Sequence, residues 1–535
     1  MTGIAQILAG TGFGPSSLFT SGAQGAWYDP SDLSTLFQDA NGTTPVTAVE
    51  QPVRLMLDRS KGLVLGSELI TNGTFDSATG WNLGAGWTIS GGQAARTTST
   101  GASNLRFDSQ ILTVGRTFVI AVDVIALDGT LVLFCGDQSS ITFTTPGLKT
   151  VRMRAAGDNR IYLQAANAAT TVTIDNISVR ELPGNHAVAP NDASRPVLRA
   201  RYNVLTFSEQ FDNAAWTVKT NLNIATGVND PFGGTAASTL TASGGSGRIV
   251  RGAGIGNFTY TASVWLRRRT GSGAVNWELW GVGIGAAINV TTEWQRFTYT
   301  DTVSGGGLFY WGIRIASNGD AIDIAFAQLL TAADQASTGG AYQRVGAATD
   351  YDTSNPVWRP YLAFDGSDDS FSTSSIDFSG TDEMTVFAGV TKLSDVAAAM
   401  LIELSANAVS NAGAWNIQAP VTGGNLEYRY LGGGSTFRSV LDSGAAAPRT
   451  DVLTATQDIS GDAMELRRSG VSVGTSALDQ GTGNFGNYPL FIGSRNNASL
   501  RFNGRIYSLI VLGRTATAAE IAATEAWVNS RTGAY

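Results

Sequence analysis

The sequence predicts an all-β chain of tandem jelly-roll β-sandwiches, with a short irregular N-terminal segment and one C-terminal helix. Three observations lead to this prediction. Glycine accounts for 64 of 535 residues and only 15% of residues are charged, which is typical of a folded chain rich in turns. Short alternating apolar and polar runs recur between turn signals about every 8 to 12 residues, as in β-sandwiches. A module of strands with a tryptophan occurs twice, which indicates duplicated domains.

The two copies of the module begin with similar stretches, residues 67–83 (SELITNGTFDSATGWNL) and residues 203–219 (NVLTFSEQFDNAAWTVK). In each stretch an aliphatic pair is followed by polar residues, a Phe-Asp step and a tryptophan. Each copy closes on a short alternating strand that carries an aspartate, Asp175 or Asp323. Several strands in so short a length fit two antiparallel sheets packed face to face, which is a jelly-roll sandwich.

The rest of the chain divides into linkers and end pieces. The first segment has turn signals and one short helical stretch but is too short for its own core. We therefore expect it to lie against the rest of the chain, a sister chain or a larger particle, and to be ordered only in that assembly. The last domain is a sandwich that ends in a helix, with Thr517 as N-cap, Glu520 three residues on and Gly533 as the stop. The predicted domains are an N-terminal segment at 1–66, a first jelly roll at 67–183, a linker at 184–202, a second jelly roll at 203–334, a linker at 335–360 and a C-terminal sandwich at 361–535.

Charge and hydropathy argue against two classes of partner. The net charge is −8, and the sequence has no basic field that could hold a phosphate backbone, so we expect no nucleic acid. No run approaches the roughly 20 apolar residues of a membrane span, so we expect no membrane insertion. The N-terminus lacks the basic and apolar regions of a signal peptide. Lysine occurs only at Lys61, Lys149, Lys219 and Lys392.

The counts of reactive residues predict that the chain is not an enzyme. Cys135 lies in the apolar run LVLFC and is expected to be a buried hydrophobe, and His186, in a linker, is expected to be structural. One cysteine and one histidine leave little room for nucleophilic or histidine-metal chemistry. No strand carries acids at alternate positions, as a glycosidase on such a sheet would need. The runs GAGIG and GVGIG are too short for a dinucleotide loop.

The C-terminal domain resembles the laminin-G/concanavalin A-like family of sandwiches. The residues that carry this resemblance are YLAFDGSDD at 361–369, FIGSR at 491–495, FNGRIYSLIV at 502–511 and the terminal helix AAEIAATEAWVNSRTG. The two repeats resemble carbohydrate-binding-module jelly rolls, through ELITNGTFDSATGW with TIDNISVREL and VLTFSEQFDNAAW with IDIAFAQL. With the N-terminal stretch GAWYDPSDLSTLFQDANGTTPVT, the whole is similar to bacteriophage tail or fibre proteins.

These resemblances imply a virion protein that binds host cell-surface polysaccharide. Residues 1–66 would bind other virion proteins, the sandwich modules would bind glycan, and the chain would form a homo-oligomer, a trimer by analogy. Two alternatives stay open. The chain could be a structural virion protein, such as a head spike or decoration, or a bacterial secreted glycan-binding protein. The absence of an export signal favours a virion location over secretion.

Aromatic residues of the second repeat are the candidates for glycan binding, because the apolar C–H face of a sugar stacks on a flat ring. Trp277 and Trp280 are three positions apart on one strand and so point to opposite faces of the sheet. At least one of them is therefore expected in the core. An arginine run at 267–269 is expected to lie at a solvated strand end. The candidates are Trp265, Trp277, Trp280, Tyr310 and Trp311.

The resemblance to carbohydrate-binding modules also implies structural calcium. The aspartates at matching places are Asp76 with Asp175, and Asp212 with Asp323; capping of a turn is the alternative role. A third acidic group, at residues 365–369, is either a calcium loop or a plain turn.

Overall fold

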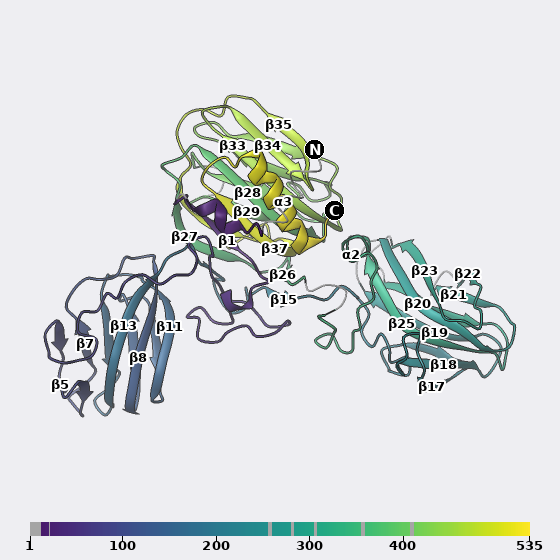
Figure 1. Cartoon of the computed structure of the whole chain (residues 1–535), viewed down its shortest axis with the longest axis horizontal. Coiled ribbons are helices and arrows are strands. Elements are labelled where there is room, and N and C mark those ends of the chain that lie inside the picture. The colour runs from purple at the N-terminus through teal and green to yellow at the C-terminus, as the bar shows by residue number, and fades with distance from the viewer. Residues whose placement is uncertain are drawn as a thin grey trace.

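The structure is a computed structural model, and it shows three β-sandwich lobes joined by linkers (Figure 1). The predicted all-β class with one C-terminal helix is confirmed, since α-helix among the described residues is confined to the short α2 (Ala332–Thr338) and to α3 (Ala518–Thr532). None of the described helices is long and apolar enough to cross a membrane. The described residues are 12–20, 22–254, 259–279, 283–303, 308–354, 359–406 and 411–535.

The first module is formed by two five-stranded antiparallel sheets, with strand orders β10-β9-β12-β7-β4 and β11-β8-β13-β6-β5. Alternate side chains of both sheets point inward and form one core. Cys135 belongs to this core, and burial raises the pKa of its thiol to about 12, so it is an unreactive buried residue, as predicted. The strands are β4 (Trp81–Leu83), β5 (Trp87–Ser90), β6 (Gln93–Arg96), β7 (Ser103–Phe107), β8 (Thr117–Asp128), β9 (Leu131–Cys135), β10 (Ser140–Phe143), β11 (Gly147–Arg154), β12 (Ile161–Ala165) and β13 (Thr171–Leu182).

The second module repeats this topology strand for strand. Its sheets have the orders β22-β21-β24-β19-β16 and β23-β20-β25-β18-β17, so each strand has a counterpart in the first module. The duplicated tryptophans also match, because each indole N–H donates to a carbonyl nine residues earlier, from Trp81 to Asn72 and from Trp216 to Phe207. The strands are β16 (Val218–Thr220), β17 (Leu222–Val228), β18 (Ala237–Ala242), β19 (Gly247–Gly254), β20 (Thr259–Thr270), β21 (Val275–Leu279), β22 (Gly283–Ile288), β23 (Gln295–Thr302), β24 (Leu308–Ile315) and β25 (Ala321–Thr331).

The C-terminal sandwich is the largest lobe and contains strands from three parts of the sequence, residues 25–56, 187–199 and 361–512. One sheet has the order β15-β26-β37-β28-β33-β34-β35 with β1 beside β37, and the other has the order β2-β3-β14-β27-β36-β29-β30-β31-β32. The strands are β1 (Gly25–Tyr28), β2 (Leu36–Phe37), β3 (Leu55–Met56), β14 (Ala187–Val188), β15 (Val197–Arg199), β26 (Tyr361–Asp365), β27 (Phe371–Asp377), β28 (Glu383–Lys392), β29 (Met400–Leu404), β30 (Trp415–Gln418), β31 (Tyr428–Gly432), β32 (Arg438–Asp442), β33 (Arg449–Asp458), β34 (Ala463–Arg468), β35 (Val471–Ser476), β36 (Asn487–Ile492) and β37 (Asn503–Leu512).

The N-terminal segment lies within this sandwich instead of standing apart from it. β26 covers residues 503–506 of β37, and β1 pairs antiparallel with residues 509–512 of the same strand, so the two short strands share one edge. Trp27 of β1 is buried between the Arg59 guanidinium, 4.2 Å from the ring centroid, and the Trp527 ring of α3 at 5.8 Å. The sequence left three partners open for this segment: the rest of the chain, a sister chain or a larger particle. In the structure it packs against the rest of the chain. Its short 3-10 turns are η1 (Pro15–Phe19) and η2 (Leu33–Thr35).

A buried polar network attaches the N-terminal segment to the first linker. The Asp58 carboxylate accepts hydrogen bonds from the backbone N–H groups of Trp27, at 2.8 Å, and Asn185, at 2.7 Å. The Asp58 N–H donates to Nδ1 of His186, and the other ring nitrogen of His186 lies 3.1 Å from the Leu182 carbonyl. Burial lowers the pKa of His186, so its neutral form is favoured. The single histidine is therefore structural, as the sequence predicted.

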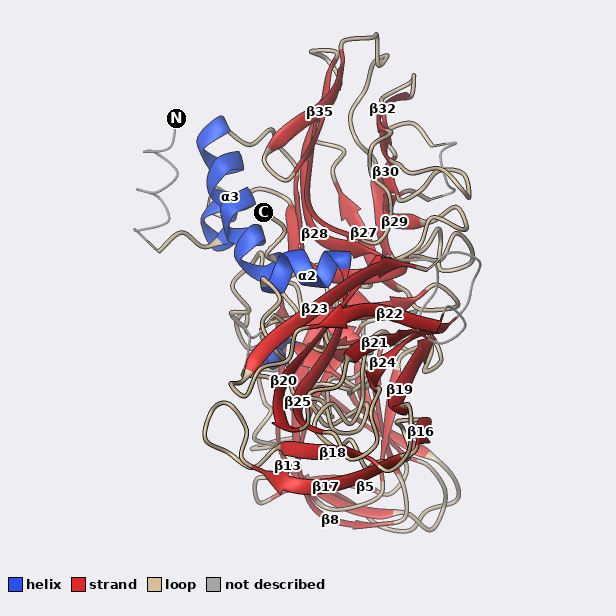
Figure 2. Ribbon diagram, turned by 90° about the vertical axis from the view of Figure 1, so that its right-hand side faces the viewer, coloured by secondary structure: helices blue, strands red, loops and turns tan. Residues whose placement is uncertain are grey.

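Helix α3 forms a third layer on the C-terminal sandwich. It packs across β28 and β33, on the face of the sheet that points away from the main core (Figure 2). The predicted cap is present: the Thr517 hydroxyl accepts from the Glu520 N–H, the Glu520 carboxylate accepts from the Thr517 N–H, and Gly533 adopts a left-handed φ of 64°. Val528 of the helix is fully buried against this face.

Candidate functional site

The five aromatic candidates of the second module fall into three groups. Trp277 and Trp311 are 4% and 0% exposed and belong to the core, so the prediction that they form a glycan platform is wrong: a buried ring has no free face for a sugar. Trp280 lies outside the described residues. Trp265 on β20 and Tyr310 on β24 are half-buried and lie on different sheets of the module.

Trp265 is part of an aromatic surface on the outer side of the sheet that contains β20 and β25. We call this surface the aromatic face and define it by Phe232, Trp265, Phe326 and Tyr342. The Phe232 ring is 70% exposed, and its centroid lies 5.4 Å from those of both Trp265 and Phe326. The Phe326 ring in turn lies 5.0 Å from Tyr342. A large apolar ring that stays exposed on such a cluster is a feature of binding surfaces.

The loop that carries Phe232 is held in place by one carboxylate. Asp230 accepts hydrogen bonds from the N–H groups of Phe232 at 2.8 Å, Gly234 at 3.1 Å and Ala236 at 3.2 Å. Such an aspartate turn fixes the backbone on both sides of the ring. The backbone that carries Phe232 is therefore fixed before a ligand binds, which reduces the entropy that the loop would lose on binding.

Polar groups lie beside the aromatic face on the same sheet. Asp323, which is 1% exposed, accepts from Arg267 at 2.8 Å, from Arg269 at 2.8 Å and from the Thr239 hydroxyl at 2.6 Å. Burial opposes ionisation of Asp323, but the hydrogen bonds from Arg269, Thr239 and Arg267 outweigh it and lower its pKa. The Arg267 guanidinium also lies 4.9 Å from the Trp294 ring. The arginine run is thus held by ion pairs at the edge of the aromatic face.

Tyr310 lies on the opposite sheet of the module, in different surroundings. Its ring covers Gly252, where an added Cβ would come within 2.3 Å of the ring, so only glycine allows the ring to lie on this strand. Nearby on the same sheet, Glu278 binds Arg248 at 3.1 Å and Arg314 at 3.5 Å. The charged groups beside Tyr310 are therefore already paired within the protein.

The proposed calcium pairs are not supported by the local structure. Asp323 faces two guanidinium groups, which occupy the place a cation would need, so its assignment as a calcium ligand is wrong. Asp175 also does not correspond to Asp323. The bulge residues with positive φ are Asn176 and Phe326, so Asp175 matches the residue just before Phe326. Of the other two, Asp76 accepts from the Thr74 hydroxyl at 2.9 Å, and Asp212 is exposed.

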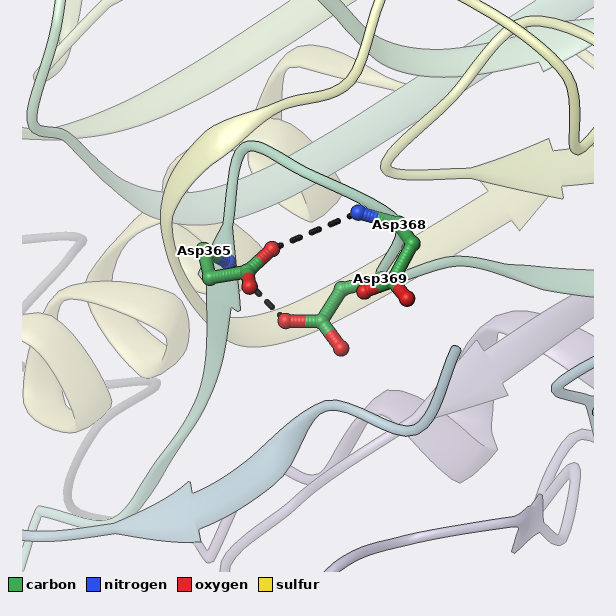
Figure 3. A group of neighbouring side chains, drawn as sticks. All are labelled: Asp365, Asp368 and Asp369. Atoms are coloured by element: carbon green, nitrogen blue, oxygen red, sulfur yellow. Dashed lines mark hydrogen bonds between the residues drawn. The ribbon is translucent and has the colours of Figure 1, made fainter. Parts of the chain in front are cut away.

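The acidic residues of the loop between β26 and β27 do come together (Figure 3). We call this the acidic loop and define it by Asp365, Asp368 and Asp369, whose carboxylate oxygens lie within 4.8 Å of one another. Asp369 is 7% exposed, and its burial is the main cause that raises its pKa to about 7. A hydrogen bond from the Asp365 N–H opposes this shift, and the charges of Asp365 and Asp368 add to it. Three oxygen donors at this spacing could bind a metal ion. Among the described residues this is the one group of three or more acids close enough to do so.

The acidic loop opens into a cleft of about 1060 Å³ between the second module and the C-terminal sandwich. The extended linker contributes Arg199 and Arg201 to one wall, and Tyr260 of β20 contributes to another. Arg199 is paired with Glu50 at 3.1 Å. The cleft therefore carries charges of both signs and is large enough for a small ligand.

The comparisons with known proteins identify the C-terminal sandwich. Residues 365–522 match a laminin-G family model described as the concanavalin A-like lectin/glucanases superfamily. The matched residues make up less than a third of the chain. This sandwich is therefore a laminin-G/concanavalin A-like domain, as the sequence resemblance implied. No curated protein matches the chain.

Solved structures show local similarity at low identity. One is a Ruminococcus gnavus IT-sialidase CBM40 bound to α2,6-sialyllactose, with 13% identity over 27% of this chain and 84% of that one, at a TM-score of 0.23. Another is the binding domain of Paraclostridial Mosquitocidal Protein 1, with 14% identity over 32% of this chain and 43% of that one, at a TM-score of 0.25. The chain spans less than half the length of the toxin binding domains that it matches.

The sequence pointed to the second module but missed most of the aromatic face. Phe232 sits in NDPFGG, where no strand alternation draws attention to it, and Tyr342 lies in a stretch read as linker. The available signal was an aromatic residue at the centre of a turn, between Asp230-Pro231 and Gly233-Gly234. An aromatic side chain at the centre of a surface turn cannot reach the core, so it stays exposed, as Phe232 does.

Proposed function

We propose that this chain is an adhesion protein that binds cell-surface polysaccharide through the aromatic face of its second module. The observation that carries the proposal is the Phe232 ring, 70% exposed and held against Trp265 and Phe326. A sugar ring offers an apolar C–H face and a polar edge. The aromatic face offers a ring surface, with guanidinium groups at its side that donate hydrogen bonds to hydroxyls.

The architecture supports binding through several weak sites. The C-terminal domain matches a superfamily whose description includes lectins, and the two other lobes are sandwiches of one duplicated topology. Separate modules in one chain raise the effective concentration of each site for a polymeric ligand. A homo-oligomer, a trimer by analogy, would increase this gain, and light scattering of the full-length protein at micromolar concentration tests it.

The biological setting we propose is a bacteriophage tail or fibre, on the resemblance of the N-terminal stretch and of the domain series. In this setting residues 1–66 would bind other virion proteins. Because β1 lies within the sandwich, such an anchor would be a folded surface of that domain. A structural virion role, as a head spike or decoration, is the second candidate, and a secreted bacterial glycan-binding protein is the third. Labelled antibody that marks the tail or the capsid of particles separates the first two.

Binding without catalysis is part of the proposal. Hydrolysis of a glycosidic bond requires two carboxyl groups on either side of it, about 5 to 9.5 Å apart. The acids beside the aromatic face do not fit, because Asp323 is held by two arginines and Asp230 by backbone N–H groups. We also propose calcium as the metal for the acidic loop, since its donors are all oxygens.

The experiment that tests the proposal compares binding of full-length variants to polysaccharides extracted from bacterial surfaces. Phe232→Ala removes the exposed ring, and Leu148→Ala removes another side chain that is also 70% exposed, on the first module. We expect Phe232→Ala to weaken binding about tenfold, because a lost aromatic contact of about 1.4 kcal/mol corresponds to that factor. Leu148→Ala should bind like the wild type.

The outcomes separate the candidates. Saturable binding that Phe232→Ala weakens and Leu148→Ala does not supports adhesion through the aromatic face. Equal binding by both variants would place the glycan site elsewhere on the chain. If the folded wild-type protein binds no extracted polysaccharide, the structural virion role becomes the better account.

A further inference from the structure

A second ligand surface lies on the first module, away from the aromatic face. Four side chains from four neighbouring strands stand in one row across the outer side of the sheet β10-β9-β12-β7-β4. Phe134 is opposite Tyr162, Tyr162 is opposite Arg106, and Arg106 is opposite Asn82. We call this set the arginine row. Since adjacent strands are about 4.8 Å apart, it spans roughly 14 Å, enough for more than one sugar ring.

The alternation of each strand places the whole row on the solvent side. In β9, β12 and β7 the flanking residues are buried, and Phe134, Tyr162 and Arg106 are half-buried, while Asn82 of β4 is exposed. The rings of Phe134 and Tyr162 stack at a centroid distance of 4.4 Å and an interplanar angle of 10°. The stacked rings form a rigid apolar ridge next to a guanidinium group.

Arg106 has no acidic partner among the described residues, since none of their carboxylates pairs with it. Its Nε is buried and without a hydrogen-bond partner. Burial raises the pKa of Tyr162, and the nearby acids Asp158 and Asp137 add to this shift. Asp158 pairs with Arg160 at 3.8 Å. A half-buried guanidinium with no acid beside it is a favourable partner for an anionic ligand, because a pair with a carboxylate would use hydrogen-bond donors that the protein leaves unpaired.

The matching row of the second module lacks both the stacked rings and the arginine. The residue in the place of Phe134, fourth in its strand, is Glu278, which binds Arg248 and Arg314. Opposite Glu278 is Gly312, and opposite Gly312 is Val250, so a glycine and a valine take the places of Tyr162 and Arg106. The stacked rings and the arginine without an acidic partner are therefore particular to the first module.

We propose that the arginine row binds a glycan that carries carboxylates, such as a chain of uronic acids. The sugar carboxylate would pair with the planar guanidinium of Arg106, the geometry that arginine favours for carboxylates. The apolar C–H face of the sugar would lie on the Phe134–Tyr162 ridge. Amide groups complete the surface: Asn82 in the row, and Asn104 with Gln164 beside it, which hydrogen bond to each other at 3.1 Å.

The test uses full-length protein and three uronic-acid polymers, polygalacturonate, alginate and hyaluronan, each compared with its carboxyl-reduced form in titration calorimetry. We expect at least one acidic polymer to bind ten times or more tightly than its reduced form, with affinity that falls as salt rises. Arg106→Gln should abolish this preference. Arg116→Gln removes the same charge from an exposed position of the same module and should leave it unchanged.

Three further measurements on single variants test the proposal. Tyr162→Ala should weaken binding of the acidic polymer, whereas Phe232→Ala should not, because the aromatic face is a separate site. Thermal unfolding of Arg106→Gln should match the wild type, since no internal partner is lost. The proposal is overturned if no acidic polymer is preferred over its reduced form, or if Arg106→Gln binds like Arg116→Gln. Either result leaves the test of Phe232 intact.

Discussion

At the scale of single residues, Asp369 shows how its surroundings set its charge. Burial and the neighbouring carboxylates of Asp365 and Asp368 all oppose its ionisation and bring its pKa to about 7, from an ordinary value of 3.8. At neutral pH Asp369 is therefore near the midpoint of its titration. A cation bound there would favour the ionised form, so proton and metal would compete for the loop.

The first prediction is that Asp369 makes the protein less stable as pH rises. The folded protein holds the proton up to about pH 7, whereas the unfolded chain releases it near pH 3.8. The stability from this group is therefore complete below the unfolded pKa and is lost as pH rises through 7. Asp369→Asn should be more stable than the wild type at about pH 8 by roughly 2 kcal/mol, with little gain near pH 4. Urea unfolding at the two pH values measures this.

Calcium provides the control for this prediction. If the acidic loop binds the ion, millimolar calcium should restore the stability of the wild type at high pH and change that of Asp369→Asn much less. An identical pH dependence for the two proteins without calcium would show that Asp369 ionises normally.

Residue-scale features were the hardest to predict from sequence. Alternation correctly indicated that at least one of Trp277 and Trp280 lies in the core, since Trp277 does, but it could not say which face of a given strand is the core. Trp311 turned out fully buried and Trp265 half-buried, although both lie in strands of similar composition. Phe232 and Arg106 were missed for a different reason: their significance lies in what is beside them, a ring cluster in one case and an absent acid in the other.

At the scale of elements, the pairing of β1 orders the N-terminal segment within the isolated chain. Its partner is residues 509–512, at the other end of the chain. The four residues of β1, Gly-Ala-Trp-Tyr, are all buried and show no alternation of polar and apolar side chains, so periodicity could not predict this strand. No local signal reveals so distant a partner. The long strands of the duplicated modules, β8 and β13 with their counterparts β20 and β25, were predictable because their alternation is sustained and occurs twice. Helix α3 was predictable because Thr517, Glu520 and Gly533 mark its two ends.

The second prediction is that residues 25–66 resist proteolysis in the isolated protein. Backbone that is paired in a sheet and packed under Arg59 and Trp527 is not accessible to a protease. Limited proteolysis followed by mass spectrometry measures this. Removal of residues 1–66 should expose the apolar edge at 509–512 and reduce the solubility of the remainder. Early cleavage within this segment would show instead that it is ordered only in a larger assembly.

At the scale of the whole molecule, a buried ion pair joins the second module to the C-terminal sandwich. Arg505 of β37 binds the Asp334 carboxylate of α2 through its two Nη atoms. Arg505 is 8% exposed and Asp334 is 0% exposed. Tyr361 lies under the guanidinium at 4.6 Å and its hydroxyl donates to the Arg201 carbonyl in the linker. The duplicated topology of the two modules could be predicted from sequence, but this joint could not, because its residues come from separate domains.

The third prediction concerns this joint. Arg505→Ala leaves the Asp334 carboxylate buried and unpaired, which should cost about 3 to 5 kcal/mol of unfolding free energy. Arg344→Ala breaks an exposed pair with Asp350 and should cost less than about 1 kcal/mol. Urea unfolding of the two variants makes the comparison. Equal stability of the two would mean that the joint contributes no more than a surface pair.

The central claim is that the chain binds glycan through surface aromatic and arginine groups on its two modules. The most direct measurement is calorimetric titration of a bacterial surface polysaccharide that contains uronic acids into the wild type and into the double variant Phe232→Ala/Arg106→Gln. The account predicts saturable binding by the wild type and loss of most of it in a double variant that remains folded. Unchanged binding by the double variant, or none by the folded wild type, would contradict it.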